Sequence, residues 1–131
     1  MKTLRIITTL LSVALLFAAC EKDNSNLIIG KWDNTAPSYD ITIAGQVDIP
    51  EGAISMEFTA DSVQISDMRC NCLPRWEHYT LTTDNGKQLL LVDNGIHGNY
   101  VVEELTSSKM VLTSTDPNID MNFMYTMKRL K

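Results

Sequence analysis

The sequence predicts an all-β domain built from short antiparallel strands. Apolar and polar residues alternate with period two over most of the chain, and short turn-forming segments separate the alternating stretches. No window after residue 26 has the 3.6-residue period of an amphipathic helix. Because alternation gives each strand one buried and one solvated face, we expect a meander that forms a barrel or a sandwich.

The expected strands follow one another at hairpin spacing. Each combines β-branched, aromatic or other apolar residues on one face with polar residues on the other. The segment around 34–50 is the hardest to assign, because Pro37 and Pro50 bracket it as a loop or a sheet edge. In chain order, we expect strands at residues 27–32, 39–43, 54–58, 63–65, 76–82, 88–92, 97–105, 110–114 and 123–127.

Turn signals lie between these strands. Asn85-Gly86 is a strong hairpin signal, because both residue types tolerate positive φ. Further turns are expected at residues 59–62, 93–95, 106–109 and 116–118, where Gly, Asn, Asp, Ser, Thr and Pro gather.

The N-terminal segment has the pattern of a signal peptide. Lys2 and Arg5 precede an apolar stretch, residues 6–19, which is too short for a membrane-spanning helix. Small residues, Ala18 and Ala19, then precede Cys20. This stretch resembles the lipobox of bacterial lipoproteins; an ordinary secretory signal with a chance cysteine is the alternative.

The lipobox resemblance implies cleavage after residue 19 and fatty acylation, with palmitate-type chains, of Cys20. Two or more acyl chains give stable anchoring, at about 0.8 kcal/mol per buried CH₂. The expected location is the Gram-negative cell envelope, at the outer membrane, on its periplasmic face or the cell surface. Residues 21–26 form a polar run without apolar periodicity, which predicts a flexible tether. The segment 20–26 is thus expected to be the lipidated cysteine and its tether.

Length and charge limit the remaining classes. Removal of residues 1–19 leaves 112 of 131 residues, enough for one domain with a single core. The formal net charge is −5, and it becomes −7 once Lys2 and Arg5 are removed. An acidic chain offers no phosphate-binding stripe, so we expect no nucleic-acid partner.

Three segments resemble the short lipocalin-like domains of Gram-negative lipoproteins. Residues 27–32 (Leu-Ile-Ile-Gly-Lys-Trp) match the opening Gly-x-Trp strand, residues 98–105 (Gly-Asn-Tyr-Val-Val-Glu-Glu-Leu) match a later strand, and residues 124–129 (Met-Tyr-Thr-Met-Lys-Arg) match the closing strand. The resemblance implies a lipocalin-like antiparallel up-and-down barrel of about eight strands over residues 27–131.

The same resemblance implies how one end of the barrel is closed. Trp32 would fill the taper, and Gly30 would allow a close approach of a neighbouring group. In lipocalins an arginine of the last strand packs over this tryptophan, which makes Arg129 the first candidate and Lys128 the second.

The Cys-x-Cys pair formed by Cys70 and Cys72 leaves three alternatives open. The pair is expected at a rim or in a loop, as a disulfide or as structural thiols. A soft-metal site that includes Met68 is the second alternative, although a lone Cys-x-Cys is a weak metal motif. Redox chemistry is the third.

The sequence predicts a binding module and not an enzyme. It has none of the local signatures of a nucleophile with His78 or His97 as base, and no motif for a phosphate, a catalytic metal or another cofactor. A barrel of this size is either filled or holds one small ligand. We expect a small apolar ligand, or otherwise an envelope protein partner or a structural or inhibitory role. The candidate cavity residues are Met56, Phe58, Tyr100, Met110 and Phe123.

Overall fold

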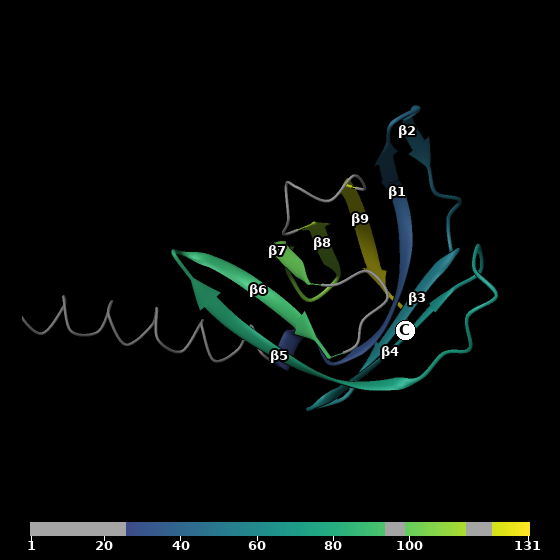
Figure 1. Ribbon diagram of the computed structural model, residues 1–131. Coiled ribbons are helices and arrows are strands. Elements are labelled where there is room, and N and C mark those ends of the chain that lie inside the picture. The colour runs from purple at the N-terminus through teal and green to yellow at the C-terminus, as the bar shows by residue number, and fades with distance from the viewer. Residues whose placement is uncertain (1–25, 94–98, 115–121) are drawn as a thin grey trace, which may run out of the picture.

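The computed structural model describes residues 26–93, 99–114 and 122–131. Nine strands account for most of these residues (Figure 1). In chain order they are β1 (Gly30–Thr42), β2 (Gly45–Asp48), β3 (Ile54–Phe58), β4 (Ser62–Asp67), β5 (Trp76–Asp84), β6 (Lys87–Val92), β7 (Tyr100–Leu105), β8 (Lys109–Ser114) and β9 (Asn122–Arg129).

Eight of these strands form a closed barrel. From β3 to β9 each strand pairs antiparallel with the next along the chain, and β1 pairs with both β3 and β9. Since β1 joins the two ends of the meander, the sheet closes on itself. The predicted all-β class and the antiparallel up-and-down barrel of about eight strands are therefore confirmed.

The long first strand departs from the prediction of two separate pieces. β1 continues through Pro37 because its register with β9 shifts between Thr35 and Tyr39, where a bulge accommodates a residue without an N–H. The backbone N–H of Thr126 donates to Ser38 Oγ at 3.0 Å, and Thr126 Oγ1 donates to the Pro37 carbonyl at 2.6 Å. These bonds fasten the bulge to the last strand.

The second strand, β2, was not expected. It pairs with the end of β1, from Tyr39↔Asp48 to Thr42↔Gly45. The resulting hairpin projects from one end of the barrel (Figure 1). We call this end the open end.

At the opposite end of the barrel, which we call the closed end, residues 26–29 form a turn. The sequence had predicted a strand at residues 27–32. Asn26 and Leu27 are helical, Ile28 is completely buried, and β1 starts only at Gly30. The indole Nε1 of Trp32 donates to the Ile28 carbonyl at 2.8 Å. The turn forms because side chains satisfy its carbonyls, which a sheet partner would otherwise have done.

Arg129 holds this turn against the end of the barrel. Its guanidinium donates to the carbonyls of Leu27 and Ile29, the latter at 2.6 Å, and its Nε donates to the Ser107 carbonyl at 2.6 Å. It also lies 4.3 Å from the ring centroid of Trp32. The predicted cation–π pair is confirmed, with Arg129 and not Lys128 as the cation.

Position 30 requires a glycine, because the Arg129 guanidinium lies directly against its backbone. The φ of Gly30 is +134°, and a Cβ at this position would collide with Nη1 of Arg129. The predicted close approach is therefore made by the arginine side chain.

The alternating residues fill the interior as expected. In β3, β6, β7 and β8 the buried side chains lie two positions apart, and the buried apolar residues of the barrel form one core cluster. Fully enclosed members include Trp32, Ile54, Met56, Phe58, Val63, Leu90, Tyr100, Met110, Leu112, Tyr125 and Met127.

Several predictions concern residues outside the described ranges. These are the signal peptide at 1–19, Cys20, all but Asn26 of the tether, His97, Gly98, and the turns at 94–95 and 116–118. Within the described ranges, no helix has the length and apolar character needed to cross a membrane.

Replacing Arg129 by alanine is expected to destabilise the barrel strongly. The variant loses a cation–π contact worth about 0.5–2 kcal/mol and charged hydrogen bonds worth about 1.5–3 kcal/mol each, so we expect a loss of at least about 2 kcal/mol. Urea unfolding measures the free energy. Lys128→Ala is the matched control, because its ion pair with Glu51 is exposed and its removal leaves the stability nearly unchanged. Equal effects of the two substitutions would contradict the assigned clamp.

Candidate ligand-binding site

The five predicted cavity residues all point into the barrel, but they do not surround one point. Phe58 pairs with Gly30 at the closed end and contacts Tyr79 edge-on, with ring centroids 5.2 Å apart. Each of the five belongs to the buried core cluster: Met56, Phe58, Tyr100, Met110 and Phe123.

Tyr100 and Phe123 lie together in the half of the barrel toward the open end. Their ring centroids are 5.4 Å apart with a 66° angle between the planes. Tyr125 stacks on Phe123 with centroids 4.4 Å apart and a 20° angle. Three aromatic rings thus form one apolar surface, in geometries favourable for aromatic pairs.

Two carboxylates face inward above these rings. Asp40 is directly opposite Phe123 in the β1–β9 ladder, and Asp67 is directly opposite Ile54 in the β3–β4 ladder. Residues opposite each other in an antiparallel pair point to the same face of the sheet. Because Phe123 and Ile54 are buried core residues, the two acidic side chains also point toward the interior.

Arg69, in the connection between β4 and β5, bridges the two carboxylates. Its Nη1 lies 2.7 Å from Asp40 Oδ2, and its Nη2 lies 2.8 Å from Asp67 Oδ2. The Arg69 Nε and backbone N–H both donate to Asp67 Oδ1 at 3.0 Å. Hydrogen bonding to Asp67, followed by the interaction with Asp40, raises the pKa of Arg69 above its ordinary value, so the guanidinium stays charged.

Two tyrosine hydroxyls complete the group, which we call the mouth cluster: Asp40, Asp67, Arg69, Tyr100 and Tyr125. Tyr125 donates to Asp40 Oδ1 over a long 3.5 Å. Burial, then the charge of Asp40, raises the pKa of Tyr125 well above its usual range. Burial, then Tyr125 and Asp67, does the same for the pKa of Tyr100. Both phenols therefore remain neutral at physiological pH.

The Tyr100 hydroxyl is the unusual member. The residue has no exposed surface, and within the described part of the chain its oxygen is a buried side-chain atom without a hydrogen-bond partner. Native proteins pair most of their buried polar atoms, so an exception calls for an explanation. An unmet hydroxyl beside charged groups is the arrangement expected where a bound molecule supplies the partner.

Sequence reasoning missed Asp40, Asp67 and Arg69 as members of a site. Acidic residues were expected on the polar face of the strands, yet these two continue the inward phase: Val63 and Ile65 lead to Asp67, and even-numbered positions from Trp32 lead to Asp40. Counting parity from Val63 would have found Asp67, but the alternation of Tyr39, Ile41 and Ile43 predicts the opposite face for Asp40.

The cysteine pair lies outside the barrel, in the connection after β4. Cys70 and Cys72 are joined in a disulfide, which agrees with the first of the three alternatives. Bridged sulfurs are neither thiolate nucleophiles nor soft metal ligands. Met68, the third sulfur of the metal alternative, is 82% exposed, and the described residues contain no group of three or more His, Cys, Asp or Glu side chains suited to a metal ion.

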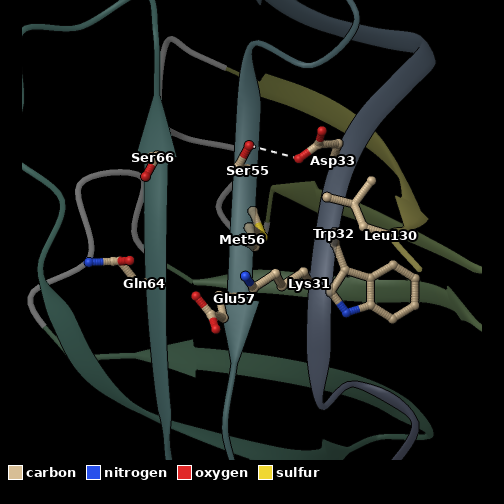
Figure 2. Close-up of a pocket in the computed structure, with 9 residues that line it drawn as sticks. All are labelled: Lys31, Trp32, Asp33, Ser55, Met56, Glu57, Gln64, Ser66 and Leu130. Carbon is tan, nitrogen blue, oxygen red and sulfur yellow. Dashed lines mark hydrogen bonds between the residues drawn. The ribbon is translucent and has the colours of Figure 1, made fainter.

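A separate shallow groove of about 240 Å³ lies on the outer face of β1, β3 and β4. Figure 2 shows its polar walls, with Ser55 bonded to Asp33 across 2.8 Å and Lys31 extending toward Glu57 on the next strand. Gln64 and Ser66 of β4 complete this wall. These polar side chains belong to the solvated face of an antiparallel sheet. Met56, one of the five predicted cavity residues, also lines the groove together with Trp32 and Leu130. The other four predicted residues do not, so the groove is not the predicted apolar cavity.

Comparisons with known proteins give only distant matches. No family model and no curated protein matches this chain. Among solved structures, an uncharacterized protein from Bacteroides eggerthii is 16% identical, with a TM-score of 0.46, and the match covers 78% of this chain and 98% of that one. A lipocalin-like protein from Bacteroides uniformis is 10% identical, with a TM-score of 0.47, and the match covers 79% and 99%. Likenesses this distant carry no argument about function, which depends on the geometry described above.

The two mouth tyrosines are expected to resist ionisation until the barrel unfolds. The pKa values of both tyrosines are raised in the folded protein. Their contribution to folding stability is therefore complete below the tyrosine pKa of the unfolded chain, about 10, and is lost as the pH rises through the folded pKa values. Tyrosinate absorbance and circular dichroism, followed together during an alkaline titration, should show a late step that coincides with unfolding. Tyr100→Phe and Tyr125→Phe should each reduce its amplitude. Full ionisation of the native protein near pH 10 would contradict the assigned burial.

Proposed function

We propose that the protein is a lipid-anchored, non-catalytic lipoprotein of the cell envelope that binds a small apolar ligand at the open end of its barrel. The observation that carries the proposal is the aromatic surface of Tyr100, Phe123 and Tyr125 beneath the mouth cluster. Buried aromatic rings beside a few convergent polar groups are typical of the lining of small-molecule sites.

The two ends of the barrel differ in what they offer a ligand. At the closed end, Trp32 and Ile28 occupy the interior, and the Arg129 guanidinium packs over Trp32. At the open end, Phe123 retains slight exposure at 8%. A ligand entering beside Arg69 would therefore meet Phe123 before it met the deeper core.

The charged groups favour binding over catalysis. Asp40 and Asp67 are both held by Arg69 at hydrogen-bond distance. A general base must be free to accept a proton from its substrate, whereas both of these carboxylates already accept hydrogen bonds from Arg69. The cluster thus supports recognition and not proton transfer.

An interaction module is the alternative, favoured by the exposed apolar side chains of the disulfide loop. Met68 and Leu73 are 82% and 84% exposed, and Trp76 follows at the start of β5, half exposed. Apolar residues gathered in one surface loop are typical of protein contacts. A partner or an inhibited enzyme of the envelope would occupy this loop. Soft-metal binding by Cys70 and Cys72 would first require reduction of their disulfide.

A neutral apolar fluorophore tests the binding proposal. N-phenyl-1-naphthylamine should bind the mature protein with increased emission, and Phe123→Leu should weaken binding about five-fold or more because the stacked ring is lost. Phe58→Leu is the matched control, since it removes a buried ring at the closed end.

The same experiment separates the two candidate functions. Equal weakening by both substitutions would mean that general destabilisation, and not the mouth, governs the signal. Absence of binding by this and other apolar probes would reject the ligand proposal. A stoichiometric envelope partner released by Leu73→Asp would then favour the interaction module.

Acylation of Cys20 can be tested directly in a Gram-negative host. We expect palmitate label in the protein and a mature N-terminus at residue 20, whereas Cys20→Ser should abolish both and release the domain from the membrane fraction. The double substitution of Cys70 and Cys72 by serine is the control, and it should leave labelling unchanged. Label retained after Cys20→Ser would overturn the anchor.

A further inference from the structure

We propose that the ligand carries a neutral or cationic hydrogen-bond-donating end group, an alcohol or an amine, and that the mouth cluster rejects an anionic carboxylate end. This inference rests on the proposed function, because it names the class of molecule that the open end would accept. It concerns the polar end of the ligand, while the aromatic surface accounts for its apolar part.

The charge balance of the cluster supports the rejection of anions. Among the described residues, the carboxylates of Asp40 and Asp67 both pair with the guanidinium of Arg69, so the charges of the mouth cluster sum to a net negative value. Arg69 already makes a bond to each of them at 2.8 Å or less. A ligand carboxylate would have to compete for this arginine while lying beside two like charges in a partly buried site, where repulsion is poorly screened.

The Tyr100 hydroxyl supports the binding of a polar end group. It is fully enclosed, and within the described residues nothing is hydrogen-bonded to it. Its pKa is raised by burial and then by Tyr125 and Asp67, which places these groups within electrostatic range of the phenol. A phenol can accept a hydrogen bond from a ligand N–H or O–H and can also donate one, so it offers a partner to any polar end group. The selection of an alcohol or an amine over a carboxylate therefore comes from the charges of Asp40 and Asp67.

The position of this hydroxyl also joins the two parts of the site. The Tyr100 ring contacts Phe123. A molecule whose apolar chain lies on Phe123 would therefore reach the Tyr100 oxygen with its polar end. Pairing that oxygen removes the cost of an unmet buried polar group, so a correctly ended ligand gains affinity that an alkane of the same length cannot.

Three probes with the same chain and different ends test the inference. Octylamine, octanol and octanoate are titrated calorimetrically into the mature protein in lipid nanodiscs at pH 7, with empty nanodiscs as reference. We expect the amine and the alcohol to bind at least about ten-fold more tightly than octanoate. Asp67→Asn should reduce this ratio several-fold, because it removes one of the repelling charges.

Tyr100→Phe separates recognition from a structural role. Loss of an unpaired hydroxyl should leave the unfolding free energy unchanged or increased, while affinity for octanol falls about five-fold or more. A purely structural tyrosine would give the opposite pattern, with lower stability and unchanged affinity.

The outcomes distinguish this inference from the function beneath it. Octanoate binding as tightly as octylamine would overturn the selectivity while leaving an apolar binding site intact. Unchanged octanol affinity in Tyr100→Phe would overturn the role of that hydroxyl. Failure of all three probes to bind would overturn the inference together with the proposed function.

Discussion

The contact of the Arg129 guanidinium with the first turn and with Trp32 is the interaction on which the rest of the structure depends. It brings a charged side chain of the last strand onto carbonyls before the first strand, at the point where β9 and β1 close the sheet. A sheet without such closure would expose two edges to unwanted pairing. Trp32 and Ile28 occupy this end of the interior, so the proposed ligand site lies at the other end.

The open end of the barrel places charged side chains beside buried aromatic rings. Burying Asp40 and Asp67 over aromatic rings is costly unless the charges are paired, and Arg69 provides the pairing from a loop. One phenol, that of Tyr100, remains unmatched within the described residues. Local conflict of this kind is common where a protein gives up some stability for recognition.

The fold was largely predictable because alternation depends on local sequence. Met56, Phe58, Val102 and Leu112 face inward as their parity required. The hairpin strand β2 and the turn at residues 26–29 were missed, since both form through partners that no local pattern specifies. The aromatic half of the site was predicted in Tyr100 and Phe123. The charged half was not predicted. Arg69 bonds to Asp67, two positions earlier, and also to Asp40, 29 positions earlier, and no local pattern specifies that second contact.

The clamp at the closed end has a mechanical consequence. The described residues start at Asn26, immediately before the turn that Arg129 holds. Under the proposed acylation of Cys20, a force on the lipid anchor would therefore act on the closed end of the barrel. That force would be transmitted to Arg129 and to the pairing between β1 and β9. The proposed lipid anchor would thus load the closed end and leave the open end unstrained.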